Sequence, residues 1–148
     1  MRGPYLDTIA YEIELLTEAL HAESVCETEC RRLAHVAHGR RLDWLAHELD
    51  AHADTEQRLV ERLARRIRDL GGQPPVCVPA AAPALELDGE AMLGLLDEER
   101  RVERRALHAC TDVASRLAAA DPDARAVLEE ALACERAHLA QLARLIPH

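Results

Sequence analysis

The sequence predicts an all-α protein, a four-helix bundle with one long crossover between the second and third helices. Alanine and leucine dominate a chain with only 6 glycines, two tyrosines, one tryptophan and no phenylalanine, and this composition favours helix almost throughout. Glycine and proline cluster at a few places and divide the 148 residues into four long segments. The connections between these segments are short, long and short, which fits a bundle with one crossover better than a simple up-down-up-down arrangement.

Each expected helix has its own start or stop signal. Gly3-Pro4 precedes the first, Gly71-Gly72 ends the second, and Asp121-Pro122 offers the fourth a capping residue followed by proline in its first turn. The expected helices span about 4–37, 42–70, 88–119 and 121–146, with the crossover over 71–87. The short connections make the first and second helices antiparallel neighbours, and likewise the third and fourth. We expect residues 1–148 to form one domain.

Charge and hydropathy exclude several classes of partner. The net charge is -9, and all 18 basic residues are arginine. This balance argues against nucleic acid or an anionic membrane as a partner, but it allows cations. No segment approaches the roughly 18 uninterrupted apolar residues of a spanning helix, and the first six residues lack a signal-peptide apolar run. We therefore expect a cytoplasmic protein, whose five cysteines are free thiols.

The inward faces of all four helices are apolar at their ends and polar in the middle. We assigned the inward positions by the alternating spacing of three and four residues. The interruptions are Glu23 and Glu27 in the first helix, His52 and Glu56 in the second, Glu99 and Glu103 in the third, and Glu135 and His138 in the fourth. A carboxylate buried without a partner is strongly destabilising, and these faces contain no arginine. The pattern therefore predicts a cation site.

The spacing of the acids repeats between the two halves of the chain. Glu23 and Glu56 lie 33 residues apart, and Glu103 and Glu135 lie 32 apart. Each half therefore has one acid on its first helix and another at the matching level of the antiparallel second helix. In the second half, Glu135 and His138 are three residues apart, so a carboxylate and an imidazole project side by side from one helical face.

With these residues and the turn Leu70-Gly71-Gly72-Gln73-Pro74, the chain resembles the ferritin-like superfamily of di-iron carboxylate proteins, and most closely its small rubrerythrin-like and bacterioferritin-like bacterial members. The resemblance covers nearly the whole chain. The metal ligands that it implies are Glu23, Glu56, Glu103, Glu135 and His138. It also implies two iron ions, with manganese as the other candidate, and oxidation of Fe(II) by dioxygen or peroxide for iron handling. This would be an oxidoreductase activity of the ferroxidase type, in a homo-oligomer that is a dimer or larger.

The chain departs from the family pattern at several positions. Leu59 stands where the family has a histidine, three residues after the acid of the second helix. His52, one turn before that acid, is expected to serve as the substitute ligand, with a hydrogen-bonded core histidine as the alternative. Cys30 and Cys110 stand where relatives often carry tyrosine, seven residues after the first acid of each half. No pair of Cys-x-x-Cys motifs is present in this sequence, so we expect no rubredoxin-type iron domain.

Other interpretations of the same residues remain open. The acids could lie at the edges of the helical faces and pair with arginine, and Glu27 and Glu99 are expected beside the ligands or in solvent. The bundle could be non-catalytic, serving as an interaction or stress-related module. It could instead bind a soft metal such as copper through Cys26, Cys30 and Cys134.

Overall fold

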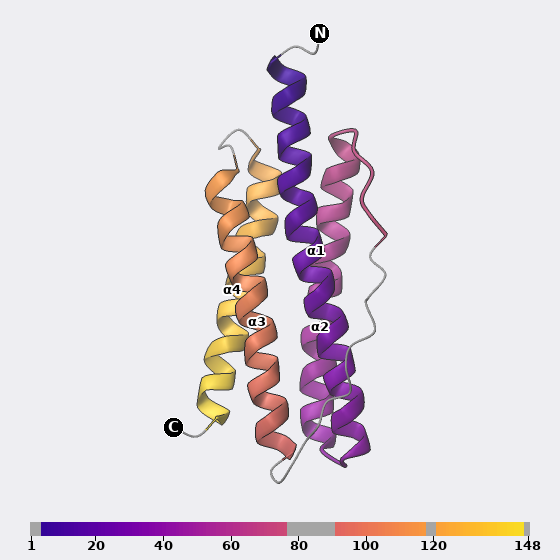
Figure 1. Cartoon of the computed structure of the whole chain (residues 1–148), viewed down its shortest axis with the longest axis vertical. Coiled ribbons are helices and arrows are strands. Elements are labelled where there is room, and N and C mark those ends of the chain that lie inside the picture. Colours follow the sequence, from indigo (N-terminus) through magenta and orange to yellow (C-terminus); the bar gives the residue numbers. More distant parts are fainter. Residues whose placement is uncertain (1–3, 77–90, 118–120, 147–148) are drawn as a thin grey trace.

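The computed structural model describes residues 4–76, 91–117 and 121–146, and these residues form a bundle of four helices (Figure 1). The helices are α1 (Pro4–Gly39), α2 (Asp43–Asp69), α3 (Ala91–Arg116) and α4 (Pro122–Leu145). The predicted all-α bundle is confirmed. The expected start of the third helix at residue 88 lies outside the described residues. None of the helices, within the described ranges, is long and apolar enough to cross a membrane.

Each helix packs mainly against two others, and these neighbours run antiparallel. α1 packs against α2 and α3, and α4 packs against the same two helices on the other side. α2 and α3 run in the same direction, so α2 ends and α3 begins at opposite ends of the bundle (Figure 1). This is the topology that the predicted crossover requires. Residues 77–90 of that crossover lie outside the described residues.

The first two helices end in the same hydrogen-bonded turn. After α2, the backbone N–H of Gly72 donates to a carbonyl five residues earlier at 2.9 Å, and Gly71 has a φ of 87°. Glycine adopts this left-handed conformation without strain. After α1, the N–H of Leu42 makes the equivalent bond at 2.9 Å, but the left-handed position is occupied by Arg41, with a φ of 60°. These turns fix how the faces of successive helices meet.

The start of α4 is tied to α2 by one buried acid. The side chain of Asp121 accepts a hydrogen bond from the backbone N–H of Ala124 at 3.0 Å, which caps the helix. Its other oxygen accepts from Nε of Arg66 on α2 at 2.9 Å. The start signal predicted at Asp121-Pro122 is therefore confirmed, and the cap also sets the position of α4 along α2.

The core consists of two main apolar clusters at different levels of the bundle. The larger side chains of one cluster include Leu15, Leu16, Leu20, Leu59, Leu63, Ile67, Val113, Leu117, Leu128 and Leu132. Those of the other are Leu33, Leu45, Leu49, Leu95, Leu96 and Leu142. The interrupted pattern of the sequence therefore corresponds to two leucine-rich regions with the mid-helix acids between them.

Candidate metal centre

The glutamates predicted at mid-helix all lie inside the bundle. Glu23, Glu56, Glu103 and Glu135 come from four different helices, and each is 0% exposed. Six of their carboxylate oxygens have no hydrogen-bond partner among the described residues. The alternative in which these acids lie at the helix edges and pair with arginine is therefore wrong. The structure therefore gathers four buried carboxyl groups with no arginine partner among the described residues.

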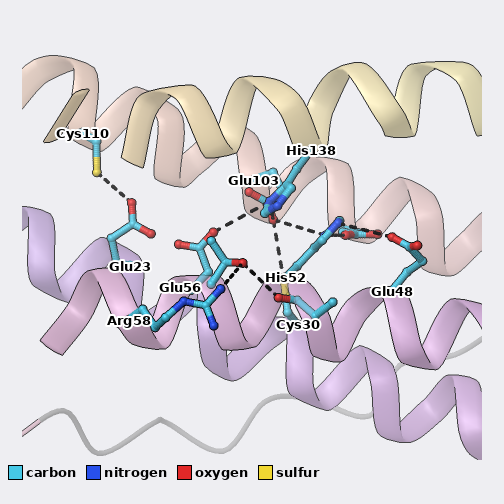
Figure 2. A network of polar contacts seen from close by, with 12 residues as sticks. Glu23, Cys30, Glu48, His52, Glu56, Arg58, Glu103, Cys110 and His138 are labelled. Atoms are coloured by element: carbon cyan, nitrogen blue, oxygen red, sulfur yellow. Dashed lines mark hydrogen bonds and ion pairs between the residues drawn. The ribbon is translucent and has the colours of Figure 1, made fainter. Parts of the chain in front are cut away.

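One group of possible ligand atoms lies where α1, α3 and α4 meet. Ligand atoms of Glu23, Cys110 and Glu135 lie within 4.8 Å of one another. The thiol of Cys110 donates to Oε1 of Glu23 at 3.1 Å (Figure 2). The other oxygen of Glu23 and both oxygens of Glu135 have no hydrogen-bond partner among the described residues.

A second group contains the imidazoles. Ligand atoms of His52, Glu103 and His138 lie within 4.8 Å of one another. Nδ1 of His138 lies 3.1 Å from Oε1 of Glu103 and 3.9 Å from Oε1 of Glu56 (Figure 2). Both oxygens of Glu56 lack a hydrogen-bond partner among the described residues. All six residues predicted as ligands are thus placed in or beside these two groups, and their role as ligands remains a prediction.

The two histidines stack on each other, and their pKa values are shifted in opposite directions. Their ring centroids lie 3.6 Å apart, with an angle of 12° between the ring planes. Burial opposes the charged form of His52, but its contact with Glu99 and the charge of Glu103 raise its pKa above the ordinary value. Burial and the neighbouring His52 lower the pKa of His138 to about 4. His138 is therefore neutral at pH 7 and has a nitrogen lone pair to offer a metal ion.

Glu99 and Glu27, the two acids expected beside the ligands or in solvent, lie in different environments. Glu99 is buried and contacts Nδ1 of His52, so of its two expected positions, beside the ligands or in solvent, it occupies the first. The sequence gave no direct signal of this contact, because His52 is on a different helix, 47 residues earlier. Glu27 lies nearer the surface and forms an ion pair with Arg31 at 3.6 Å. It is a neighbour of the site and contributes to the charged exterior.

Burial of the carboxyl groups strongly favours their protonated forms. Burial raises the pKa of Glu103 to about 8, with Glu99 and Glu23 adding to the shift and His52 opposing it. Burial together with contact with Glu23 raises the pKa of Glu135 to about 11. Without a cation, these two carboxyl groups therefore hold protons at neutral pH. A metal ion would take the place of those protons.

The two cysteines at the positions where relatives often carry tyrosine contact acids of the neighbouring helix. Cys110 on α3 donates to Glu23 on α1, and Cys30 on α1 lies 3.9 Å from Oε1 of Glu103 on α3. Burial and the charge of Glu23 raise the pKa of Cys110, so that its thiol keeps its proton. The sequence carried a signal for these contacts. Two equal spacings of seven residues on antiparallel neighbouring helices bring each cysteine level with the acid across the interface.

The thiols are free, and only some lie near the acids. Cys26, Cys30, Cys110 and Cys134 form no disulfide, which confirms the expectation for the four described cysteines. Cys77 lies outside the described residues. Among the described residues, Cys26 and Cys30 join Glu103 in a third group of possible ligands, and Cys134 joins none of the three groups.

The donor set fits hard or intermediate divalent cations. Carboxylate oxygens and a neutral imidazole suit Fe(II) and Mn(II), whereas sulfur-only sites select softer metals. Leu59, at the position where a second family histidine was expected, is buried in an apolar cluster. The site therefore offers its nitrogen donors asymmetrically, with both histidines stacked at one end.

Comparison with known proteins identifies the family. The family model for the ferritin-like domain matches residues 13–147, so the chain belongs to the ferritin-like domain family. The comparison with curated proteins gave no match.

Two solved structures share the fold. One is the bacterioferritin of Desulfovibrio desulfuricans, described with its diiron site in different catalytic states. It has a TM-score of 0.80 and 22% identity over 97% of this chain and 82% of the other. The second is the bacterioferritin of Rhodobacter capsulatus, described with a metal-free dinuclear site and heme iron. Its TM-score is 0.79, with 21% identity over 99% of this chain and 86% of the other.

Proposed function

We propose that this chain binds two metal ions between its four helices, with iron first and manganese as the alternative, and that it oxidises Fe(II) for iron handling. The observation that carries the proposal is the set of six buried carboxylate oxygens that have no hydrogen-bond partner within the described ranges. Such groups need a proton or a cation to be stable in a protein interior. Membership of the ferritin-like domain family and the likeness to a bacterioferritin described with a diiron site favour iron as that cation.

The carboxylate oxygens that lack a hydrogen-bond partner among the described residues suggest which acids chelate or bridge the ions. Neither oxygen of Glu56 or of Glu135 has a hydrogen-bond partner in the part of the chain that the structure describes, so each acid can chelate one ion or bridge two. Glu23 and Glu103 each leave one such oxygen and complete the carboxylate set. His138 adds a neutral imidazole. His52 is retained as an additional ligand because its Nδ1 lies 3.9 Å from Oε1 of Glu103.

The chain's own groups handle protons and exclude water around the centre. Iron held there would supply the Fe(II)/Fe(III) couple. Oxidation by peroxide consumes two Fe(II), two protons and one hydrogen peroxide, and yields two Fe(III) and two waters. Glu103 and Glu135 release their protons when a cation binds, because its charge stabilises their ionised forms. The leucine-rich clusters on either side keep bulk water away from these groups.

A row of polar side chains connects the centre with the surface. Nε2 of His52 lies 3.8 Å from Oε2 of Glu48, and the side chain of Glu48 is 43% exposed. Gln141 on α4 donates to the same oxygen of Glu48 at 2.9 Å. Figure 2 shows Glu48 beyond His52, on the side away from Glu23. We propose that protons reach and leave the centre along this row.

Metal content and Fe(II) oxidation test the proposal in paired variants. Glu56→Gln/Glu135→Gln removes the two acids with both oxygens free while keeping their shape, and Glu61→Gln/Glu129→Gln makes the same charge change at exposed positions of the same helices. We expect the natural protein and the exposed-site variant to bind two ions per chain and to oxidise Fe(II) in air. The buried-site variant should do neither. Equal metal content in all three proteins would overturn the proposal, and binding without oxidation would favour the non-catalytic alternative.

We also propose a homo-oligomer, from the resemblance, together with the single domain and the cytoplasmic location that the sequence predicts. The match over residues 13–147 supports one domain for nearly the whole chain. Light scattering of the purified protein tests the oligomer, because a monomeric mass at micromolar concentration would contradict it.

A further inference from the structure

Two buried thiols lie next to the carboxylate centre, at the interface between α1 and α3. Cys26 and Cys30 are one helical turn apart on α1, and they are 1% and 0% exposed. Their sulfur atoms and a carboxylate oxygen of Glu103 lie within 4.8 Å of one another. Figure 2 shows Cys30 on the α1 side of Glu103. Three potential ligands of two chemical types therefore converge on one point.

The spacing of the thiols suits a bridging cation better than a disulfide. Residues four apart on a helix have Cβ atoms about 5–6 Å apart, whereas a disulfide needs about 3.5–4.5 Å. A disulfide would therefore require α1 to unwind locally, and both cysteines are free. A cation with metal–sulfur bonds of about 2.3 Å joins sulfur atoms up to about 4.6 Å apart. The helix can keep its shape around such an ion.

A hollow in the surface gives access to this point. A depression of about 240 Å³ lies between α1 and α3, and Cys26 is among the residues that line it. Val25 and Val102 make much of its wall apolar, His21 contributes an imidazole, and Arg105 contributes one positive charge. An ion that enters here meets Cys26 without passing through the carboxylate centre.

We propose that Cys26, Cys30 and Glu103 form a second cation site, selective for thiophilic ions such as Cu(I), Zn(II) or Cd(II). Two sulfurs and one carboxylate favour these ions over Fe(II) and Mn(II), because soft ligands select soft cations. Binding replaces the thiol protons, which are released to solvent. Glu103 also belongs to the carboxylate centre, but the thiol site forms whether or not that centre is loaded.

Cadmium titration of the full chain tests the site, because cadmium–thiolate bonds give an ultraviolet charge-transfer band. All samples are reduced and carry Cys77→Ser and Cys110→Ser, so that neither the cysteine outside the described residues nor the thiol beside Glu23 and Glu135 contributes to the band. We expect a band that saturates at one Cd(II) per chain. Cys26→Ser or Cys30→Ser should weaken the affinity for Cd(II) by more than about 10-fold. Changing a residue that only contacts a metal ligand already lowers affinity by about 10-fold or more. Cys134→Ser, the matched control on α4, should leave the band unchanged.

Further variants separate this proposal from the proposed function. Glu56→Gln/Glu135→Gln removes the carboxylate centre, and we expect it to keep the cadmium band. Loss of the band in Glu56→Gln/Glu135→Gln would overturn the proposal of an independent thiol site. Absence of the band from the natural protein would also overturn it, and so would a band that survives in Cys26→Ser/Cys30→Ser. Cys26→Ala/Cys30→Ala, which replaces the thiols by small apolar groups, should also lose the band while its circular dichroism stays helical. The cadmium band can therefore be absent while Fe(II) oxidation is retained, and Fe(II) oxidation can be absent while the band is retained.

Discussion

Replacing one buried carboxyl group should stabilise the metal-free protein and weaken the proposed metal binding. Glu135 is 0% exposed, both of its oxygens lack a hydrogen-bond partner among the described residues, and its pKa is raised to about 11. In the unfolded chain the same group has its ordinary pKa of 4.5. Folding at neutral pH therefore requires Glu135 to take up a proton. Glu135→Gln keeps the shape of the side chain and removes that requirement.

The expected gain in folding free energy follows from the difference between the pH and the ordinary pKa of Glu135. At pH 7, about 2.5 pH units above the ordinary pKa, protonating Glu135 costs about 3 kcal/mol of folding free energy. At pH 5 the same cost is below about 1 kcal/mol. The folded pKa lies above the unfolded one, so the cost grows as pH rises between these values. Glu135→Gln should therefore gain about 2 to 3 kcal/mol over the natural protein between pH 5 and pH 7.

Thermal unfolding in the presence of a chelator measures this difference. A gain of about 3 kcal/mol corresponds to a melting temperature about 6 to 12 °C higher for a chain of this length. The matched control is Glu129→Gln, which removes an exposed carboxylate from the same helix and should show no such dependence on pH. A difference between Glu135→Gln and the natural protein that stays constant from pH 5 to pH 7 would refute the reasoning.

Three further predictions address the centre and the turn after α1. The metal-free protein should lose stability from about pH 5 to pH 8, because Glu103, with its pKa raised to about 8, must hold a proton to stay buried. The Mn(II)-saturated protein should gain stability over the same range, because protons compete with the metal; melting curves that fall with pH in both forms would contradict this. His138→Ala should weaken Mn(II) binding about 10- to 100-fold in calorimetry. The control is His108→Ala, which changes an exposed histidine. Equal Mn(II) affinities of the two variants would exclude His138 as a ligand. Arg41→Gly should raise the free energy of unfolding in urea by about 1 kcal/mol, because Arg41 has a positive φ that glycine adopts freely; a loss of stability would show that the Arg41 side chain outweighs the strain.

Helical periodicity was sufficient to predict the bundle and the burial of the four glutamates. An α-helix turns by 100° per residue, so residues three and four apart share a face wherever the chain stays helical. Glu23 and Glu56 could be matched because a short turn joins their helices. Glu103 and Glu135 could be matched for the same reason. The local sequence thus determined which side chains point into the bundle and which of them lie at the same height along its axis.

Contacts between helices that are distant in the sequence could not be predicted in this way. Glu99 meets His52 only because α2 and α3 adopt one particular offset, and their connection includes residues 77–90, which carry no register signal. The opposite pKa shifts of His52 and His138 also depend on their stacking, since the neighbouring ring helps to lower the pKa of His138. These features are properties of the packed bundle rather than of any single helix.

Anomalous diffraction from crystals of the full chain soaked with Mn(II) would locate the bound ions directly. We predict strong peaks in the bundle interior, within coordination distance of Glu23, Glu56, Glu103 and Glu135, and loss of these peaks in Glu56→Gln/Glu135→Gln. A map with peaks only at exposed acids or histidines, and none among the four buried carboxylates, would contradict a metal centre at this position.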